Sequence, residues 1–398
     1  MIRQMSCFLI QVAKLQNMWL KSRVFNKKYS FGVFFMSSCK RIAMFLLILQ
    51  HHLLMENRLD ILFILNPISG TVSKEKIPTL IEKKLDKERF NTTIIYTQYA
   101  GHAKEIAHEA RLQGTDIVVA VGGDGTVNEV ASALVHSDTA LGIIPCGSGN
   151  GLARHLLLPM NIEKAIDVIN ECKVKALDYG VINDNPFFCT CGMGFDAFIS
   201  MKFANSNKRG VVSYVENVLL EGLTYQPEIY EIEDESGTKR YKAFLISCAN
   251  ASQYGNNAYI APQASMSDGM LDVIIMEPFD IFDAPQISID MFNKTLNKNS
   301  KIKTFKTKKI NIHRSKPGYI HYDGDPVETG RDIEIAIQEK GIKVIINANG
   351  DVSKRQPNVL QTAFNEFFNN IHLIRDDINK QGRHIQAIGK NWQRKLKH

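Results

Sequence analysis

The 398-residue sequence has no run of about 20 apolar residues, the length that a membrane-spanning helix needs. The longest apolar run in its N-terminal part, residues 42–49, is far shorter. No GxxxxGK[ST] stretch occurs, which excludes a P-loop nucleotide site. The seven cysteines form no CxxC pair and have no histidine at zinc-ligand spacing. We therefore expect reduced core cysteines in a cytoplasmic protein and no zinc site.

Acidic residues are missing from positions 1–54, which carry eight Lys and Arg. Because the net charge of the chain is +7, the remaining residues contribute −1, and such a body gives no indication of nucleic-acid binding. The leader also has no well-placed small-residue cleavage site, so it fits a secretory signal poorly. We interpret it as an upstream extension of a reading frame that begins at Met55, with a basic membrane-attachment arm as the alternative.

Predicted strands and helices alternate from residue 58 onward. The segment at residues 59–65, apolar except for Asp60, is typical of a strand buried on both faces. Three more strands, each followed by a helical pattern, are predicted at 92–97, 115–121 and 141–145. Repeated strand–loop–helix units predict a parallel, doubly covered sheet with right-handed crossovers. We place this α/β nucleotide-binding domain at residues 55–175.

Short strands bounded by Gly, Asn, Asp and Pro follow from about residue 175, and several alternate with period 2. They predict an antiparallel β-sandwich-like domain at residues 176–350 that binds lipid and metal, interrupted by helices near 211–223 and 279–297. The apolar segments 186–195 and 211–223 either line a lipid pocket or belong to the core. For residues 351–398 we expect a C-terminal helix that returns to the first domain, with a basic end.

Glycine-rich loops follow the predicted strands of the first domain, notably "GGDGT" at 122–126 and "CGSGNG" at 146–151. In a parallel sheet such loops meet at the carboxyl edge, where ligands bind. Glycines let backbone N–H groups approach phosphate oxygens, and the helix N-termini that follow add partial positive charge. An ordinary βα turn is the alternative for any single loop. Two glycine clusters on successive strands favour a phosphate site, although neither has the GxGxxG spacing of a dinucleotide site.

Seven motifs in order resemble the diacylglycerol kinase catalytic-domain family, which includes bacterial soluble diacylglycerol-type lipid kinases and sphingosine kinases. They are "NPISG", "TQYAGHA", "GGDGTVNEV", "PCGSGNGLAR", "GMGFDA", "SDGMLDV" and "HYDGD". The resemblance covers roughly residues 58–347. "GGDGT" alone is less specific, because NAD kinases and phosphofructokinases share close relatives of it. The chain departs from the family pattern at Asp325, where Glu is usual, and at "GSGNG", where many bacterial members have "GTxND".

The resemblance implies ATP and Mg²⁺ as cofactors. It implies that Asp323 is the general base, although sphingosine kinases give that role to the residue matching Asp124, so the division between the two stays open. A structural magnesium site would use the Asp268 side chain with carbonyl groups of Ser265 and Met270. The implied nucleotide contacts are Asn66, Pro67, Ser69, Gly70, Thr97, Gly122, Gly123, Asp124, Gly125, Thr126, Asn128, Ser148 and Asp325.

We therefore expect a kinase that transfers the γ-phosphate of ATP to the hydroxyl of a membrane lipid, of diacylglycerol or sphingoid type, at the inner face of the membrane. Two alternatives remain: a kinase of a soluble acceptor such as NAD, and a catalytically silent nucleotide- or lipid-binding module in which the change at Asp325 has cost activity. Asp-Gly is also a strong hairpin signal, so Asp323 and Asp268 can be simple turn residues. Which lipid is used, and whether the chain forms a homodimer, stay open.

Overall fold

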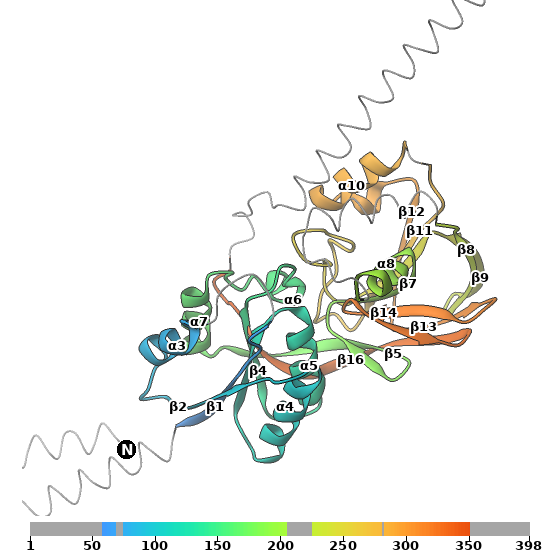
Figure 1. Cartoon of the computed structure of the whole chain (residues 1–398). Helices are drawn as coiled ribbons and strands as arrows, with labels where there is room; N and C mark the ends of the chain where they lie inside the picture. Colours follow the sequence, from blue (N-terminus) through green and yellow to red (C-terminus); the bar gives the residue numbers. More distant parts are fainter. Residues whose placement is uncertain (1–57, 69–74, 205–224, 281, 351–398) are drawn as a thin grey trace, which may run out of the picture. The chain divides into compact units, whose positions relative to one another are not determined.

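The computed structural model describes residues 58–68, 75–204, 225–280 and 282–350 (Figure 1). The expected leader, the 211–223 helix and the C-terminal helix therefore lie outside the described residues. Nearly all described residues fall in one compact unit, which contains 60–86 and the described residues from 92 onward. No helix in these described ranges is long and apolar enough to cross a membrane.

A parallel sheet forms the first part of this unit, with strand order β2-β1-β3-β4. The strands β1 (Leu59–Leu65), β3 (Ile117–Gly122) and β4 (Ala140–Pro145) pair in parallel, and β2 (Phe90–Tyr96) lies beside β1. Every residue of β3 and β4 is buried, as the apolar runs predicted.

Helices cover both faces of this sheet. On one side α4 (His102–Leu112) packs against α5 (Asp124–Leu134), and on the other α3 (Ile77–Lys84) packs against α7 (Ile162–Glu171) (Figure 1). A short helix, α6 (Gly151–His155), follows the glycine-rich loop after β4. The predicted doubly covered α/β architecture is confirmed.

One long strand, β16 (Asp332–Ile345), extends the parallel sheet into the second half of the chain. Its end runs parallel to β4, with Val344 opposite Leu141. Its other part pairs antiparallel with β13 (Lys309–Arg314), and β5 (Val174–Ile182) pairs along its length with a register shift between Gln338 and Ile342. The sheet continues through β8 (Glu228–Asp234) and β9 (Gly237–Ala243), and β6 (Asn185–Phe187) pairs with β5. The two predicted domains therefore share one continuous sheet.

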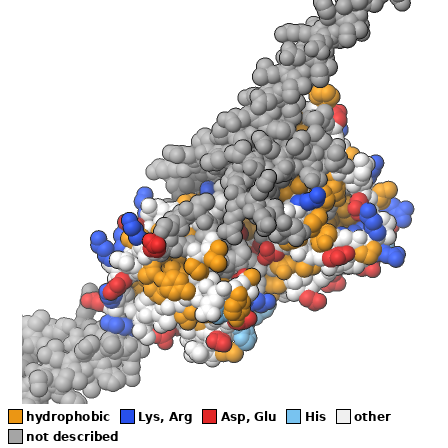
Figure 2. Space-filling model, in the orientation of Figure 1, with side chains coloured by type: hydrophobic (Ala, Val, Ile, Leu, Met, Phe, Trp, Pro, Cys, Tyr) orange, Lys and Arg blue, Asp and Glu red, His pale blue; other side chains and the backbone are white. Residues whose placement is uncertain are grey.

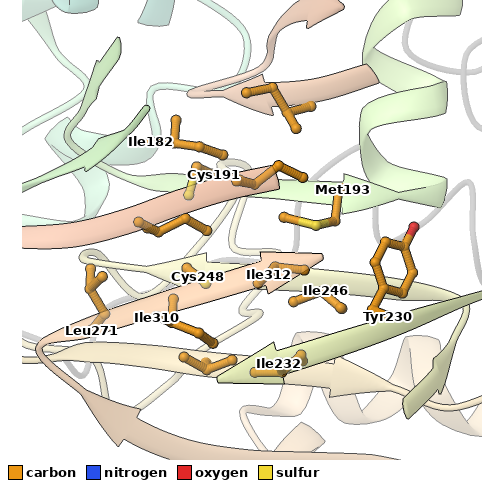
Figure 3. Close-up of a cluster of buried hydrophobic side chains, with 14 of the residues drawn as sticks. Ile182, Cys191, Met193, Tyr230, Ile232, Ile246, Cys248, Leu271, Ile310 and Ile312 are labelled. Carbon is orange, nitrogen blue, oxygen red and sulfur yellow. The ribbon is translucent and has the colours of Figure 1, made fainter. Parts of the chain in front are cut away.

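A second, antiparallel sheet completes a β-sandwich. Its order is β12 (Ile302–Thr307), β11 (Leu271–Met276), β10 (Leu245–Ala249), β7 (Thr190–Gly194), β14 (Gly318–Tyr322) and β15 (Asp325–Thr329). Side chains of both sheets meet in one apolar core, in which Ile232 and Ile312 of the first sheet pack with Met193 and Ile246 of the second (Figure 3). The antiparallel sandwich predicted from the period-2 segments is confirmed.

Helix α8 (Phe195–Ala204) packs against β14 and β15, while α10 (Ala284–Asn293) and the short 3₁₀ helix η1 (Leu296–Lys298) follow β11. The first of the two expected lipid-lining segments lies partly in the sandwich core, because Phe187 and Cys191 are fully buried there. All five described cysteines are free thiols and four of them are buried, as expected.

Basic and acidic side chains are mixed on the face shown in Figure 2. In the lysine-rich segment 301–309, each of the five lysines pairs with a carboxylate. A segment that is strongly basic in sequence is therefore largely neutralised by its neighbours.

Candidate active site

Two glycine-rich loops touch backbone to backbone at the carboxyl edge of the parallel sheet. A Cβ on Gly147 would lie 2.6 Å from the Cα of Gly123, and a Cβ on Gly122 would lie 2.5 Å from Thr126 Oγ1. Glycine at these positions is therefore required by packing. Gly125 is different, because a Cβ there would have nothing within 4 Å. Packing therefore does not require glycine at this position, and the space beside the first turn of α5 is open.

Asp124, the first residue of α5, holds the second glycine loop. One carboxylate oxygen accepts the Asn150 N–H at 2.8 Å and the other accepts the Gly151 N–H at 2.6 Å. Burial raises the pKa of Asp124 above its ordinary value, and these two backbone bonds oppose the shift. The nearby carboxylate of Asp323 raises it further. With one such bond at each oxygen, the carboxylate retains lone pairs for another partner.

The N-terminus of α5 differs from its neighbours in how it is capped. The Glu129 carboxylate accepts the N–H groups of Gly101 and Ala103 at the start of α4, and Asp124 does the same for the start of α6. Within the described ranges, no side chain accepts the N–H groups of Gly125 or Thr126 in the first turn of α5. N–H groups without a side-chain acceptor, together with the positive end of a helix dipole, favour an anion. An anion is therefore best placed at α5.

Hydroxyl and amide groups expected at the nucleotide surround this end of α5. Asn66 Nδ2 donates to Thr126 Oγ1 at 3.1 Å, which ties the loop after β1 to α5. Thr97 is buried at the end of β2, Ser148 is exposed in the second glycine loop, and Pro67 is exposed beside Asn66. Ser69 and Gly70 lie outside the described residues. The structure thus gathers at one sheet edge the expected loops that it describes.

Asp323 reaches this edge from the β-sandwich. It forms a two-residue hairpin with Gly324 between β14 and β15, and the φ angles of 49° and 94° fit a type I′ turn. Its Oδ2 accepts Asn128 Nδ2 at 2.9 Å and the Phe188 N–H at 2.8 Å. Its Oδ1 accepts the N–H groups of Cys189 at 2.7 Å and Thr190 at 3.1 Å. Asp323 is therefore both a turn residue and a contact to α5.

Asp325, the first residue of β15, sits among other carboxylates. Its pKa is raised to about 6, first because surrounding protein partly desolvates it and then through Asp323 and Glu129, while His321 opposes the shift. By surface area Asp325 is exposed, so the desolvation is partial and solvent screens the charges. Among the described residues no hydrogen-bond or ion-pair partner contacts its carboxylate. Asp325 follows Asp323 by two residues across the turn and begins β15 opposite Tyr322.

Family models match both halves of the chain. The diacylglycerol kinase catalytic domain matches residues 60–182, and the YegS C-terminal NAD kinase beta sandwich-like domain matches residues 189–346. The chain belongs to the diacylglycerol kinase catalytic-domain family. This assignment confirms the resemblance read from the ordered motifs.

Individual relatives of this diacylglycerol kinase-family chain agree. It is 28% identical over 274 residues to a diacylglycerol kinase of Bacillus subtilis (strain 168), which covers 66% of this chain and 88% of the relative. It is 31% identical over 207 residues to a probable lipid kinase YegS of Escherichia coli O17:K52:H18, which covers 50% of this chain and 69% of the relative. A crystal structure of a putative diacylglycerol kinase from Bacillus anthracis str. Sterne aligns with a TM-score of 0.59 and 22% identity, covering 74% of this chain and 99% of that one, and supports the fold.

The implied structural metal position carries a lysine in this family member. Lys306 Nζ lies 2.7 Å from Asp268 Oδ2 and 3.1 Å from Asp272 Oδ2. Lys306 and Asp272 are directly opposite on β12 and β11, so strand register fixes the pairing. The remaining Asp268 oxygen accepts the Met270 N–H at 3.2 Å, and the Ser265 hydroxyl lies 3.4 Å from that of Ser267.

The structural magnesium site at this turn, with the Asp268 carboxylate and the carbonyl groups of Ser265 and Met270, stays a prediction. The ammonium of Lys306 contacts both nearby carboxylates, so a cation bound by Asp268 would have to displace it. The Asp268–Gly269 turn is also held by the protein, since the Gly269 N–H donates to Asp178 at 2.9 Å.

Sequence reasoning missed two polar residues of the site in this diacylglycerol kinase-family chain. Arg154 donates from Nε to the Gly149 carbonyl at 2.9 Å, and among the described residues its other guanidinium N–H groups have no hydrogen-bond partner. Asn150 bridges the second glycine loop through Gly147 N–H and C=O. Both residues lie inside the "PCGSGNGLAR" motif, so the sequence places them in the second glycine loop. Their hydrogen-bond partners could not be predicted from the sequence.

Proposed function

We propose that this protein is an ATP-dependent lipid kinase that phosphorylates the hydroxyl of a membrane lipid of diacylglycerol or sphingoid type. One observation carries the proposal: the Asn128–Asp323 hydrogen bond joins the glycine-loop helix to the late Asp-Gly turn. A phosphate-binding helix end and a carboxylate-rich turn from a distant part of the chain thereby share one site. Phosphoryl transfer needs this combination of positioned phosphates and an acid–base group near the acceptor.

The phosphate side of the proposal rests on the first turn of α5. Its N–H groups at Gly125 and Thr126 have no side-chain acceptor in the described structure, and the open space at Gly125 lets an anion approach. Ser148 adds an exposed hydroxyl, and Arg154 adds guanidinium donors at the adjacent loop. In the proposal the β- and γ-phosphates of ATP lie here, with Asn66, Pro67 and Thr97 toward the rest of the nucleotide.

The same edge fits Mg²⁺ carried by the phosphates. Mg²⁺ in nucleotide sites is bound by one or two carboxylates together with substrate phosphates and water. Asp124 has free lone pairs at the first turn of α5, and the nearby carboxylate of Asp323 adds negative charge there. When bound, Mg²⁺ would neutralise charge on the transferring phosphate. Asp124 would orient it while holding the second glycine loop.

An aromatic cluster packs around helix α8 in the β-sandwich half of the chain. Helix α8 packs against β14 and β15, and its partly buried Phe195 and Phe198 pack with Tyr225 and Phe244, with the Phe195 and Phe244 ring centroids 4.5 Å apart. The names of the relatives support a lipid over a soluble dinucleotide as the acceptor. In the proposal the protein works at the cytoplasmic membrane surface.

The direct test uses purified protein, radiolabelled ATP, Mg²⁺ and a total lipid extract, with NAD as a parallel acceptor. Transfer of label to a lipid, with no labelled NADP, is the expected result. Labelled NADP without labelled lipid would assign the soluble-acceptor alternative. ATP binding with no labelled product on any acceptor would assign the silent module.

A further inference from the structure

The two aspartates implied as candidate bases differ in how much of their carboxylates is already used. A carboxylate offers about four acceptor positions, two on each oxygen. Asp323 fills all of them, with Asn128 and Phe188 on Oδ2 and with Cys189 and Thr190 on Oδ1. A substrate hydroxyl would have to displace one of these fixed donors to reach it. Asp323 is thus built as an anchor between α5 and the chain before β7.

Asp124 is also held on both oxygens, by the N–H groups that begin α6. It lies at the phosphate end of α5, where a carboxylate serves the nucleotide side of the site. Asp325 is the contrasting case. It is exposed, and among the described residues no donor contacts its carboxylate. The Gly324 turn places it two residues after the anchor, opposite Tyr322 on β14, so the anchor fixes its backbone.

We propose that Asp325 is the carboxylate that accepts the proton of the acceptor hydroxyl, and that Asp323 is a positioning residue that holds it there. This inference rests on the proposed kinase function. In the reaction, the hydroxyl oxygen forms a bond to the γ-phosphorus while the bond from that phosphorus to the β–γ bridging oxygen breaks. The electron pair of the broken bond leaves with ADP, and the hydroxyl proton passes to Asp325. Asp323 contributes no proton transfer.

The shorter side chain at this position fits the role. Glu is usual in the family where this chain has Asp325, and an Asp carboxylate stays one methylene closer to the turn that Asp323 anchors. The alternative of a catalytically silent module treats Asp325 as a change that cost activity. In this proposal Asp325 is still a base, with a shorter and stiffer side chain than Glu. Asp325→Glu therefore tests reach alone, since it keeps the carboxylate and changes only its distance from the backbone.

The experiment compares Asp325→Asn, Asp325→Glu, Asp323→Asn and Glu328→Gln in the full-length protein. Glu328 is the matched control, because it is an exposed carboxylate on the same strand. For each variant we would measure kcat for lipid phosphorylation at saturating ATP, the Kd for ATP and the Tm. A general base contributes about 10²–10⁴-fold to the rate, and the loss of kcat should fall in that range for Asp325→Asn. Its ATP Kd and Tm should stay near wild type.

The other variants separate the base from the anchor. Asp325→Glu should retain kcat within about tenfold, because a carboxylate remains within reach of the hydroxyl. Asp323→Asn should lower the Tm and raise the Kd for ATP, because the amide cannot accept all four donors. Glu328→Gln should match wild type in all three measurements.

The outcomes are distinguishable. An active wild type with an Asp325→Asn variant of nearly equal kcat overturns this inference and leaves the kinase function standing. Loss of kcat in Asp323→Asn with an unchanged Tm and ATP Kd returns the base role to Asp323. A wild-type protein that labels no lipid overturns the proposed function and this inference with it.

Discussion

The side-chain amide of Asn128 donates a 2.9 Å hydrogen bond to the carboxylate of Asp323, which lies 195 positions later in the chain. Asn128 stands one helical turn after Asp124 on α5, so the two residues share a face of the helix. This contact ties the first turns of α5 to the turn that carries Asp325. The consequences of that geometry can be measured at individual residues.

Asn128→Leu should destabilise the protein. The substitution removes one donor from a largely enclosed carboxylate and places an apolar side chain against it. Hydrogen bonds to charged groups contribute about 1.5–3 kcal/mol, and we expect the free energy of unfolding in urea to fall by about that amount. Asn311, an exposed residue bonded to Glu233, is the matched control, and Asn311→Leu should change it by less than about 0.5 kcal/mol. An equal decrease in the free energy of unfolding for both variants would show that the Asn128–Asp323 hydrogen bond stabilises the protein no more than an exposed one.

The two kinds of glycine in the site should respond oppositely to alanine. Gly147→Ala places a Cβ 2.6 Å from the Gly123 backbone, so the loops must separate and the Tm should fall. Gly125→Ala meets nothing within 4 Å and should leave the Tm unchanged. Because the added methyl group fills the space proposed for phosphate, Gly125→Ala should still raise the Kd for ATP at least tenfold. Calorimetric unfolding and ATP titration of the two variants measure both effects. An unchanged Kd for ATP in Gly125→Ala would contradict the proposal that a phosphate of ATP binds at the first turn of α5.

The parallel sheet and the sandwich could be predicted because a strand buried on both faces is a continuous apolar run, whereas a strand buried on one face alternates between apolar and polar residues. The run from residue 61 to 65 has no polar residue, and residues 332–338 alternate between apolar and polar, so each pattern indicates which faces of the strand are buried. Nothing in residues 332–345 tells that one end pairs with β4 and the other with β13. That choice depends on register and on the shift between Gln338 and Ile342.

The site divides in the same way. The glycine loops were predictable because they follow strands whose carboxyl ends share an edge. The four donors on Asp323 were not, because three of them are backbone N–H groups, which every residue but proline has. The pairing of Lys306 with Asp268 and Asp272 was equally hidden. It requires the β11–β12 register, which places Lys306 opposite Asp272.

Because Lys306 contacts Asp268 and Asp272, the stability of the Asp268–Gly269 turn should not depend on divalent ions. Without nucleotide, we expect Mg²⁺ or EDTA to leave the Tm of the wild-type protein unchanged, because the ammonium already contacts both carboxylates. Lys306→Met removes that charge. Its Tm should be lower than wild type and should rise with added Mg²⁺, since hard cations bind carboxylate oxygens.

Lys303→Met is the control for this comparison, because Lys303 lies on the same strand and pairs with Glu277. Its Tm should show no added dependence on Mg²⁺. A Mg²⁺-dependent rise in the wild-type Tm that disappears in Asp268→Asn would contradict the expectation, because it would mean that the ion displaces the lysine.

The pH dependence of the rate should report Asp325. Its pKa is about 6, raised by partial desolvation and by Asp323, Glu129 and Asp124, with His321 opposing. A base must be ionised to act, so kcat/KM for ATP, which reports the free enzyme, should rise about tenfold per pH unit below pH 6 and level off above it. In Asp325→Asn, kcat/KM should no longer rise with pH below pH 6. A wild-type rate that is flat from about pH 5 to 7 would assign the essential proton transfer to another group.

The same shift has the opposite sign for stability. Because the pKa of Asp325 is raised in the folded state, the neutral form is favoured by folding. That stabilisation is fully present below the unfolded pKa and is lost as pH rises through about 6. Asp325→Asn is neutral at every pH, so at about pH 7.5 it should unfold at a temperature equal to or above that of wild type while being far less active. Since solvent screens the exposed carboxylate, the gain should be small. A clear drop in the Tm of Asp325→Asn would instead identify Asp325 as a structural residue and would explain its loss of activity without proton transfer.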